Sequence, residues 1–410
     1  MLRWLLLFSF VLTVTLEPVL KNQGNQVENR ISTKEEEWFQ DEDWEEEEEK
    51  DHEEGDERID ESFMEDISAR NIKERKCGKF PWFIRTVVFL PIVRYKIRSG
   101  LFNLFKDLAK PSSYGIQNGK NIRIPTTNGS LGAWFLWPVG SSMTDISDLG
   151  PQDTLIIYMH GNSATRGFGH RLELYRFLTN LGFYVLSFDY RGFGDSTNVE
   201  LSETTVVTDG LNVLTWAASF FKDSSSQMKG GPLLIVWGHS LGTSIATITT
   251  NQWQGLDKYP ISGLVLESSF TTMEDMVQHF KLGRAMVSWL NLNVSAELKC
   301  ADAEFRSSNY LLNITVPTLA LHSEDDRIVP ARLGEQLVKS AIDGGKTNIS
   351  FLHLYRNHEM ENNKFQDLLN MTRSIISNIV GYTQHPTWTR IFRISLVSLE
   401  VVRELTNVQV

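Results

Sequence analysis

The alternation of short apolar runs with segments of helical spacing constrains the fold of this chain more than any other feature. The expected strands are 154–159, 183–188, 233–237, 261–266, 318–321 and 349–354, and the expected helices are 171–180, 204–221, 243–251 and 363–379. Strands that are apolar throughout are typical of a parallel sheet covered by helices on both faces. The sequence therefore predicts an α/β fold with a mostly parallel sheet, and ligands beyond the carboxyl ends of its strands.

Composition indicates a globular domain joined to one acidic segment. Hydrophobic residues make up 41% of the 410, enough for a sizeable core. Between Lys34 and Asp66 there are 20 acidic and 3 basic residues, a local charge of −17, and the remaining 31 acidic and 37 basic residues sum to +6. No concentrated basic patch points to nucleic acid. No Cys/His cluster has zinc-ligand spacing, and we expect neither a metal nor a cofactor.

The N-terminal part divides into three segments. Residues 1–20 carry an uncharged apolar run from Trp4 to Leu16 behind one arginine, which predicts a secretory signal or an uncleaved signal-anchor. Residues 21–79 predict a disordered acidic spacer, because they cannot bury enough apolar surface to offset the entropy of ordering. Residues 80–110 predict an amphipathic lead-in that packs on the domain, contacts a membrane surface, or does both.

The folded domain is expected over 111–381, with a C-terminal tail over 382–410. An insertion at about 270–313, between two expected core strands, predicts a helical cap whose apolar side chains line an acyl pocket or seal the cap onto the body. Whether Cys77 and Cys300 pair stays open. Five Asn-x-Ser/Thr sites agree with a glycoprotein in the secretory pathway: Asn128, Asn293, Asn313, Asn348 and Asn370.

Residues 238–242 read Gly-His-Ser-Leu-Gly and fit the pattern Gly-x-Ser-x-Gly. An apolar run leads into the motif and helical spacing follows it, as the strand–turn–helix of a nucleophile elbow requires. Such a turn exposes the hydroxyl of Ser240, and its glycines let neighbouring backbone pass without a Cβ clash. The alternative is a Gly-rich turn with an incidental serine. We predict Ser240 as nucleophile, with the other elbow positions at Gly238, His239, Leu241 and Gly242.

A serine nucleophile needs a base, and the base needs an orienting acid, in the chain order Ser, Asp or Glu, His. Asp325 and Asp326 follow an expected strand and are the candidate acids. The candidate bases are His353, His358 and His385. We favour His358, because it follows the last expected strand in a loop, where a base at a strand end must lie to reach the serine.

The oxyanion of an acyl-transfer intermediate needs two backbone donors. We expect one to be the N–H of Leu241, the residue after the nucleophile. The second is expected from the loop after the first expected strand, where Gly161 permits close approach and the Asn162 N–H is the donor. His160 is expected to brace this loop.

Five motifs together resemble those of the alpha/beta hydrolases, and within them the family of alpha/beta-hydrolase domain-containing protein 12 and its paralogue 12B. The resemblance runs from about Phe80 to Gly381. The motifs are His-Gly-Asn-x-x-x-Arg-Gly (160–167), Phe-Asp-Tyr-Arg-Gly-x-Gly-Asp-Ser (188–196), Trp-Gly-His-Ser-Leu-Gly-Thr (237–243), Leu-Glu-Ser-x-Phe-Thr (266–271) and His-x-Glu-Asp-Asp-x-x-Val-Pro (322–330).

The resemblance implies a serine hydrolase of the endoplasmic reticulum membrane whose catalytic domain faces the lumen; a secreted protein is the alternative. Implied substrates are lysophospholipids, notably lysophosphatidylserine, and monoacylglycerols. Matched by position, the triad is Ser240, Asp326 and His358, and the Asp-x-x-Val-Pro spacing favours Asp326 over Asp325. Two other hypotheses are an inactive lipid- or protein-binding protein and an acyltransferase. The acyltransferase is disfavoured because no histidine is followed by aspartate five positions on.

Overall fold

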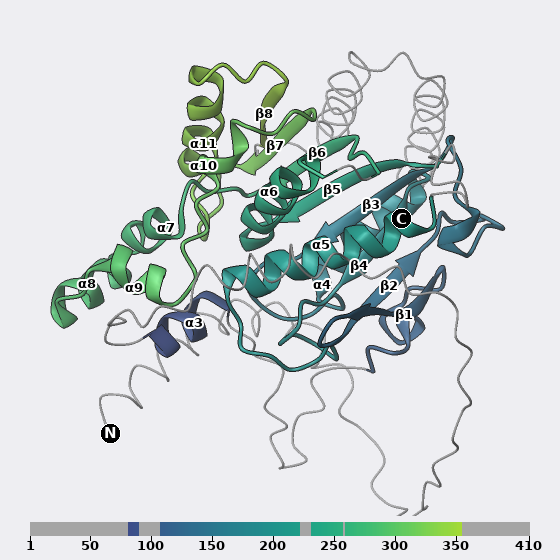
Figure 1. Cartoon of the computed structure of the whole chain (residues 1–410), viewed down its shortest axis with the longest axis horizontal. Helices are drawn as coiled ribbons and strands as arrows, with labels where there is room; N and C mark the ends of the chain where they lie inside the picture. The colour runs from purple at the N-terminus through teal and green to yellow at the C-terminus, as the bar shows by residue number, and fades with distance from the viewer. Residues whose placement is uncertain (1–80, 90–106, 222–230, 257–258, 355–410) are drawn as a thin grey trace, which may run out of the picture. The chain divides into compact units, whose positions relative to one another are not determined.

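The computed structural model describes residues 81–89, 107–221, 231–256 and 259–354. Within them, eight strands form one sheet in the order β1-β2-β4-β3-β5-β6-β7-β8 (Figure 1). The strands are β1 (Gly119–Thr126), β2 (Gly129–Leu136), β3 (Thr154–Met159), β4 (Tyr184–Phe188), β5 (Leu233–His239), β6 (Gly263–Glu267), β7 (Thr318–Ser323) and β8 (Ile349–Leu354).

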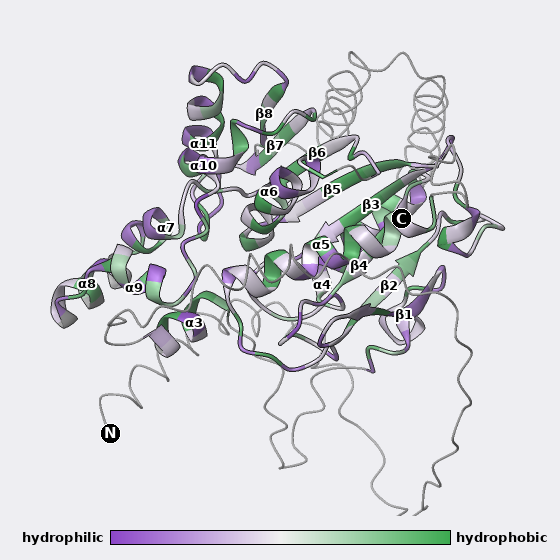
Figure 2. Cartoon of the chain, viewed as in Figure 1, coloured by the Kyte–Doolittle hydropathy of each residue, from purple (hydrophilic) through white to green (hydrophobic). Residues whose placement is uncertain are grey.

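The six strands from β3 to β8 pair in parallel, which confirms the mostly parallel sheet expected from the sequence. Strand β3 is buried along its whole length, as a strand covered on both faces must be. Strand β5 runs two residues beyond the expected end, so that Gly238 is opposite Met159 on one side and Leu266 on the other. Figure 2 shows β3 among the most hydrophobic segments.

Strands β1 and β2 were not expected from the sequence. They form an antiparallel hairpin, and β2 also pairs antiparallel with β4. Lys120, Arg123 and Pro125 interrupt β1, so no apolar run marks it. A proline lacks the N–H of a ladder bond, and this one lies on the edge strand of the sheet, where prolines are tolerated.

The helices cover both faces of the sheet. Apolar side chains of α5, α6 and α11 form one core with one face of the sheet. Apolar side chains of α4 form a second core with the opposite face. The helices are α3 (Pro81–Phe89), α4 (Gly169–Asn180), α5 (Glu203–Ser219), α6 (Leu241–Gln254), α7 (Met273–His279), α8 (Lys281–Leu290), α9 (Val294–Cys300), α10 (Ser308–Leu311) and α11 (Ala331–Asp343), with short 3₁₀ turns at Pro111–Tyr114 and Ile146–Asp148.

Four helices, α7 to α10, lie between β6 and β7, where the sequence predicts a cap. Helices α7, α8 and α9 lie together to one side of the sheet, with α3 beside α9 (Figure 1). Met276 is buried and Met273 packs against the same core, so these two side chains seal the insertion onto the body. The expected helix over 363–379, the signal segment, the spacer and the tail lie outside the described residues, as does Cys77.

A carboxyl group joins the insertion to the start of α5. The Phe305 N–H donates to Glu203 Oε2 at 2.6 Å, and the Glu203 N–H donates to the Asp302 carbonyl at 2.6 Å. Burial raises the pKa of Glu203, and the hydrogen bond from the Phe305 N–H lowers it. The effect of burial is the larger, and the pKa is about 7. The folded protein therefore holds a proton here at pH values where the unfolded chain has released it.

We expect this proton to make stability depend on pH. A carboxyl whose pKa is raised by folding stabilises the folded state most below its ordinary pKa of 4.5, and that contribution is lost as pH rises through about 7. Glu203→Gln keeps an acceptor for the Phe305 N–H but cannot ionise. Urea unfolding at pH 5 and pH 7.5 should show a smaller fall in the free energy of unfolding for the variant than for wild type. An equal fall in both proteins would contradict this account.

Candidate active site

Ser240 occupies a strained turn between β5 and α6. Its φ is 53° and its ψ is −120°, a backbone conformation rare for a residue other than glycine. The turn directs the chain from the end of β5 into α6, whose first residue is Leu241. The N–H of Leu241 has no acceptor within its own helix, because the first four N–H groups of a helix are unpaired there. The geometry is that of a nucleophile elbow.

Close backbone approach explains the glycines of the elbow. A Cβ at Gly242 would clash with the carbonyl oxygens of Met159 and His160, and one at Gly238 would clash with backbone at Gly242. A Cβ at Gly161 would lie 3.2 Å from Ser240 Cβ. The loop after β3 therefore passes directly beside the serine, and the predicted oxyanion donor Asn162 belongs to that loop.

His160 is fully buried behind this loop. Its Nδ1 lies 2.7 Å from the Gly161 carbonyl, and its Nε2 lies 3.4 Å from Asp189 Oδ1. The Tyr190 hydroxyl donates to the His160 carbonyl at 3.1 Å, and the two rings are in contact with centroids 4.5 Å apart. These contacts make His160 a brace of the loop, as expected from the sequence.

His239, directly before the serine, is held neutral. Burial lowers its pKa to about 4, and its ring lies against His170, with centroids 5.1 Å apart. Burial likewise lowers the pKa of His170 to about 3. At neutral pH neither ring places a positive charge beside Ser240.

The two candidate acids have different surroundings. Asp326 follows β7, and its side chain is 17% exposed. Its Oδ1 accepts the N–H groups of Ile328 and Val329 at 2.8 and 2.9 Å, and its Oδ2 accepts the Ser268 hydroxyl at 2.9 Å. Asp325 is exposed, and its Oδ1 accepts the Ser323 hydroxyl at 2.5 Å. Asp326 is the carboxylate held in one orientation, and its catalytic role stays a prediction.

The predicted base, His358, lies outside the described residues, and so does His385. His353 lies in β8, where its Nδ1 pairs with Glu324 and is 3.7 Å from Glu335 Oε1. These two partners are exposed carboxylates, not Asp326. His353 therefore belongs to a polar cluster on the rim of the sheet.

This rim cluster is one group of described residues that could hold a metal ion. The nearest donor atoms of Glu324, Glu335 and His353 all lie within 4.8 Å of one another. All three side chains are partly or fully exposed, and exposed acidic groups are common without an ion. We assign no metal to it.

A buried ion network braces the strand ends and was not predicted as such. Arg166 Nη1 donates to Asp189 Oδ2 and to Asp195 Oδ1, each at 2.6 Å, and the Arg166 guanidinium stacks over Trp134 at 5.2 Å. Burial raises the pKa of Asp189, but Arg166 and His160 outweigh this and hold it below its usual value. Arg166 and the two aspartates belong to two of the sequence motifs. These two motifs therefore include residues that stabilise the fold around the candidate site, in addition to predicted site residues.

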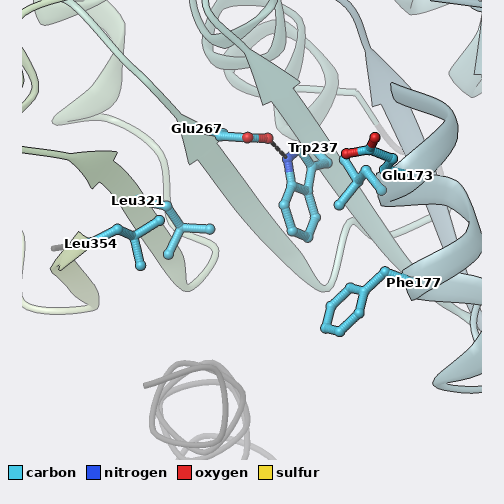
Figure 3. Close-up of a pocket in the computed structure, with 7 residues that line it drawn as sticks. Glu173, Phe177, Trp237, Glu267, Leu321 and Leu354 are labelled. Carbon is cyan, nitrogen blue, oxygen red and sulfur yellow. Dashed lines mark hydrogen bonds between the residues drawn. The ribbon is translucent and has the colours of Figure 1, made fainter. Parts of the chain in front are cut away.

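An apolar groove of about 260 Å³ lies on the face of the sheet that α4 covers. In Figure 3 Trp237 and Glu267 approach each other from neighbouring strands, and Phe177 faces them from α4. The Trp237 Nε1–H donates to Glu267 Oε2 at 3.0 Å, and burial raises the pKa of this carboxyl. The lining residues are Glu173, Leu174, Phe177, Trp237, Glu267, Leu321 and Leu354. Of the predicted site residues that the structure describes, none lines the groove.

The chain is similar to known proteins over a large part of its length. A family model described as serine aminopeptidase, S33 (Hydrolase_4) matches residues 150–311. Lysophosphatidylserine lipase ABHD12 of Danio rerio is 32% identical over 279 residues, which cover 64% of this chain and 67% of the relative. Protein ABHD12B of Homo sapiens is 33% identical over 273 residues, covering 62% of this chain and 71% of the relative.

Solved structures give a weaker likeness. An esterase of Pyrococcus furiosus, Pf2001, has a TM-score of 0.44 and 19% identity, over 66% of this chain and 93% of the esterase.

Proposed function

This chain belongs to the ABHD12 and ABHD12B family of alpha/beta hydrolases, and on that premise we propose that it hydrolyses fatty-acyl esters of single-chain glycerolipids. Lysophosphatidylserine is the first candidate substrate, because several relatives are named lysophosphatidylserine lipases. The match covers 67% of the length of the Danio rerio lipase and 64% of the length of the Xenopus tropicalis lipase. Monoacylglycerol, which offers the same ester on an uncharged glycerol, is the second.

The strained turn at Ser240 is the observation that carries the proposal. A positive φ at a non-glycine residue costs free energy, and such strain gathers at functional sites. Here it lies at the carboxyl end of a central strand, beside a glycine loop. Asp326, held by three donors, is at the end of a strand two places away in the same sheet.

The proposed mechanism gives each predicted residue one role. His358 removes the proton of Ser240 as its oxygen attacks the acyl carbonyl, and Asp326 orients the imidazole. The N–H groups of Leu241 and Asn162 hold the oxyanion. His358 then protonates the departing glycerol oxygen, and a water activated by the same base releases the fatty acid.

Hydrolysis of defined lipids tests the proposal. The full chain, expressed in membranes, is supplied with lysophosphatidylserine, lysophosphatidylcholine, monoacylglycerol or diacylphosphatidylserine, with Ser240→Ala membranes as the blank. We expect fatty acid release from the single-chain lipids above the blank. Release from none of the four lipids by folded wild type would overturn the proposal, and release from the two-chain lipid alone would overturn the substrate class.

We also propose that the lipid substrate reaches the enzyme at a membrane surface. Among the described residues, no helix is long and apolar enough to cross a bilayer. Exposed aromatic rings instead lie on α3 and at the two ends of α8: Trp82, Phe280 and Trp289 are 59%, 39% and 62% exposed. Amphipathic segments carrying such rings are typical of proteins that lie on a membrane.

A lumenal location, which we propose, predicts which sequon carries a glycan. Asn128 is exposed in the two-residue turn between β1 and β2, so its amide is accessible. Asn348 is engaged, because its Nδ2 donates to the Thr315 carbonyl at 2.5 Å and its Oδ1 accepts from Lys346. On a gel, Asn128→Gln should migrate ahead of wild type by one glycan, endoglycosidase treatment should abolish that difference, and Asn348→Gln should migrate with wild type. A secreted or membrane-bound chain without glycan at Asn128 would contradict this.

A further inference from the structure

We propose that Ser268 is a positioning residue that holds the carboxylate of Asp326 for the reaction of Ser240. This inference rests on the proposed function. Ser268 follows β6 directly, and its hydroxyl donates to Asp326 Oδ2 at 2.9 Å. The two residues are 58 positions apart in the chain, so only the pairing of β6 with β7 brings them together.

Hydrogen bonds from residues that the structure describes fill three acceptor positions of Asp326. A carboxylate has about four lone-pair positions, two on each oxygen. The N–H groups of Ile328 and Val329 both donate to Oδ1, and Ser268 donates to Oδ2. His322 Nε2 lies 3.8 Å from Oδ2, too far for a hydrogen bond, and is 2.8 Å from the Val329 carbonyl instead. Among the described residues, these contacts leave one position, on Oδ2, for the N–H of a catalytic base.

The backbone of Ser268 is strained in the way that functional residues are. Its φ is 56°, a left-handed value that a serine adopts at a cost. The Ser268 N–H donates to the Leu321 carbonyl at 2.9 Å, which fixes the residue against β7. Glycine would meet the same backbone requirement without strain. Serine adds a hydroxyl, and in this structure that hydroxyl is bonded to Asp326.

The residue before Ser268 connects this bond to the nucleophile. The Ser240 N–H donates to the Glu267 carbonyl at 2.8 Å. The dipeptide 267–268 therefore binds the nucleophile backbone at one end and the acid side chain at the other. A shift of the end of β6 would therefore move Ser240 and the carboxylate of Asp326 together, so that the acid keeps its position relative to the elbow.

The test compares Ser268→Ala with Ser269→Ala in the full chain. Alanine at 268 keeps the Cβ and the backbone strain and removes only the hydroxyl. Ser269 is the matched control, because its hydroxyl is buried and has no hydrogen-bond partner among the described residues. Two quantities are measured for each protein. They are the rate of labelling by a fluorophosphonate probe, and kcat and KM for the hydrolysis of monoacylglycerol. We expect Ser268→Ala to lower the labelling rate and kcat by roughly 10-fold to 100-fold at unchanged KM, as for one bond to a charged group, and Ser269→Ala to change neither.

A double-mutant cycle separates positioning from a general effect on structure. In an Asp326→Ala background, Ser268→Ala should cause no further loss of labelling. An equal loss in both backgrounds, or labelling of Ser268→Ala as fast as Ser269→Ala, would overturn the proposal. Should Ser268→Ala fail to fold, Ser268→Gly removes the hydroxyl and relieves the strain, and full labelling of that variant would overturn it as well.

The same experiment distinguishes the two proposals from each other. Wild type that is labelled but hydrolyses no single-chain lipid would overturn only the substrate assignment, and the labelling rates would still test Ser268. Folded wild type that is not labelled at all would overturn the proposed function, and the positioning role would fail with it.

Discussion

Replacing Ser240 by alanine is expected to lower lipid hydrolysis to the level of membranes that lack the protein, a loss of roughly 10⁴-fold to 10⁶-fold. The variant loses the oxygen that attacks the acyl carbonyl. It keeps the Cβ, so the strain at φ 53° is unchanged, and the Ser240 hydroxyl makes no capping bond to α6. The free energy of unfolding should therefore stay within about 0.5 kcal/mol of wild type. Fluorophosphonate labelling, lipid hydrolysis and thermal unfolding measure the three quantities.

Ser244, one turn along the same helix, supplies the control. Its hydroxyl is buried and 2.6 Å from the Ser307 hydroxyl, away from the elbow. Ser244→Ala should cost about 1 kcal/mol of stability and retain both labelling and hydrolysis. Labelling that survives Ser240→Ala would show that Ser240 is not the residue that the probe modifies. An equal loss of labelling in both variants would contradict a specific role of the Ser240 hydroxyl.

Replacing Arg166 by methionine is expected to destabilise the domain by about 3–5 kcal/mol, which lowers Tm by roughly 10 °C. The guanidinium is fully buried and bonds Asp189 and Asp195, and its Nη2 also donates to Asn121 Oδ1 at 2.9 Å. Methionine fills a similar volume but leaves the carboxylate of Asp189 buried without its cation. Urea unfolding measures the loss.

The control for this prediction shares a partner with Arg166. Arg123 Nη2 lies 3.2 Å from Asp195 Oδ2, but its side chain is 47% exposed. An exposed pair of this kind contributes less than about 1 kcal/mol, so Arg123→Met should be nearly neutral. Adding Asp189→Asn to Arg166→Met should recover part of the stability, because it removes the unpaired buried charge. Equal destabilisation by the two arginine variants would contradict the network.

The sequence alone was enough to predict the sheet class and the strand–turn–helix around Ser240. Both depend on local patterns: a strand buried on both faces is apolar throughout, as 154–159 is, and an elbow needs its glycines and serine within five residues. The hairpin of β1 and β2 was missed because polar residues and a proline interrupt its edge strand. The helix α11 was also not predicted, although it packs on the core.

Tertiary structure decided which side chains around Ser240 contact one another. Arg166 and Asp189 are 23 residues apart, and Ser268 and Asp326 are 58 apart. The difference between the exposed Asp325 and the bonded Asp326 likewise appears only in the fold. Residue periodicity reports which face of an element is buried, but not which distant side chain it meets there. The contact between two distant side chains depends on the order and register in which the strands pair, so only the folded sheet determines it.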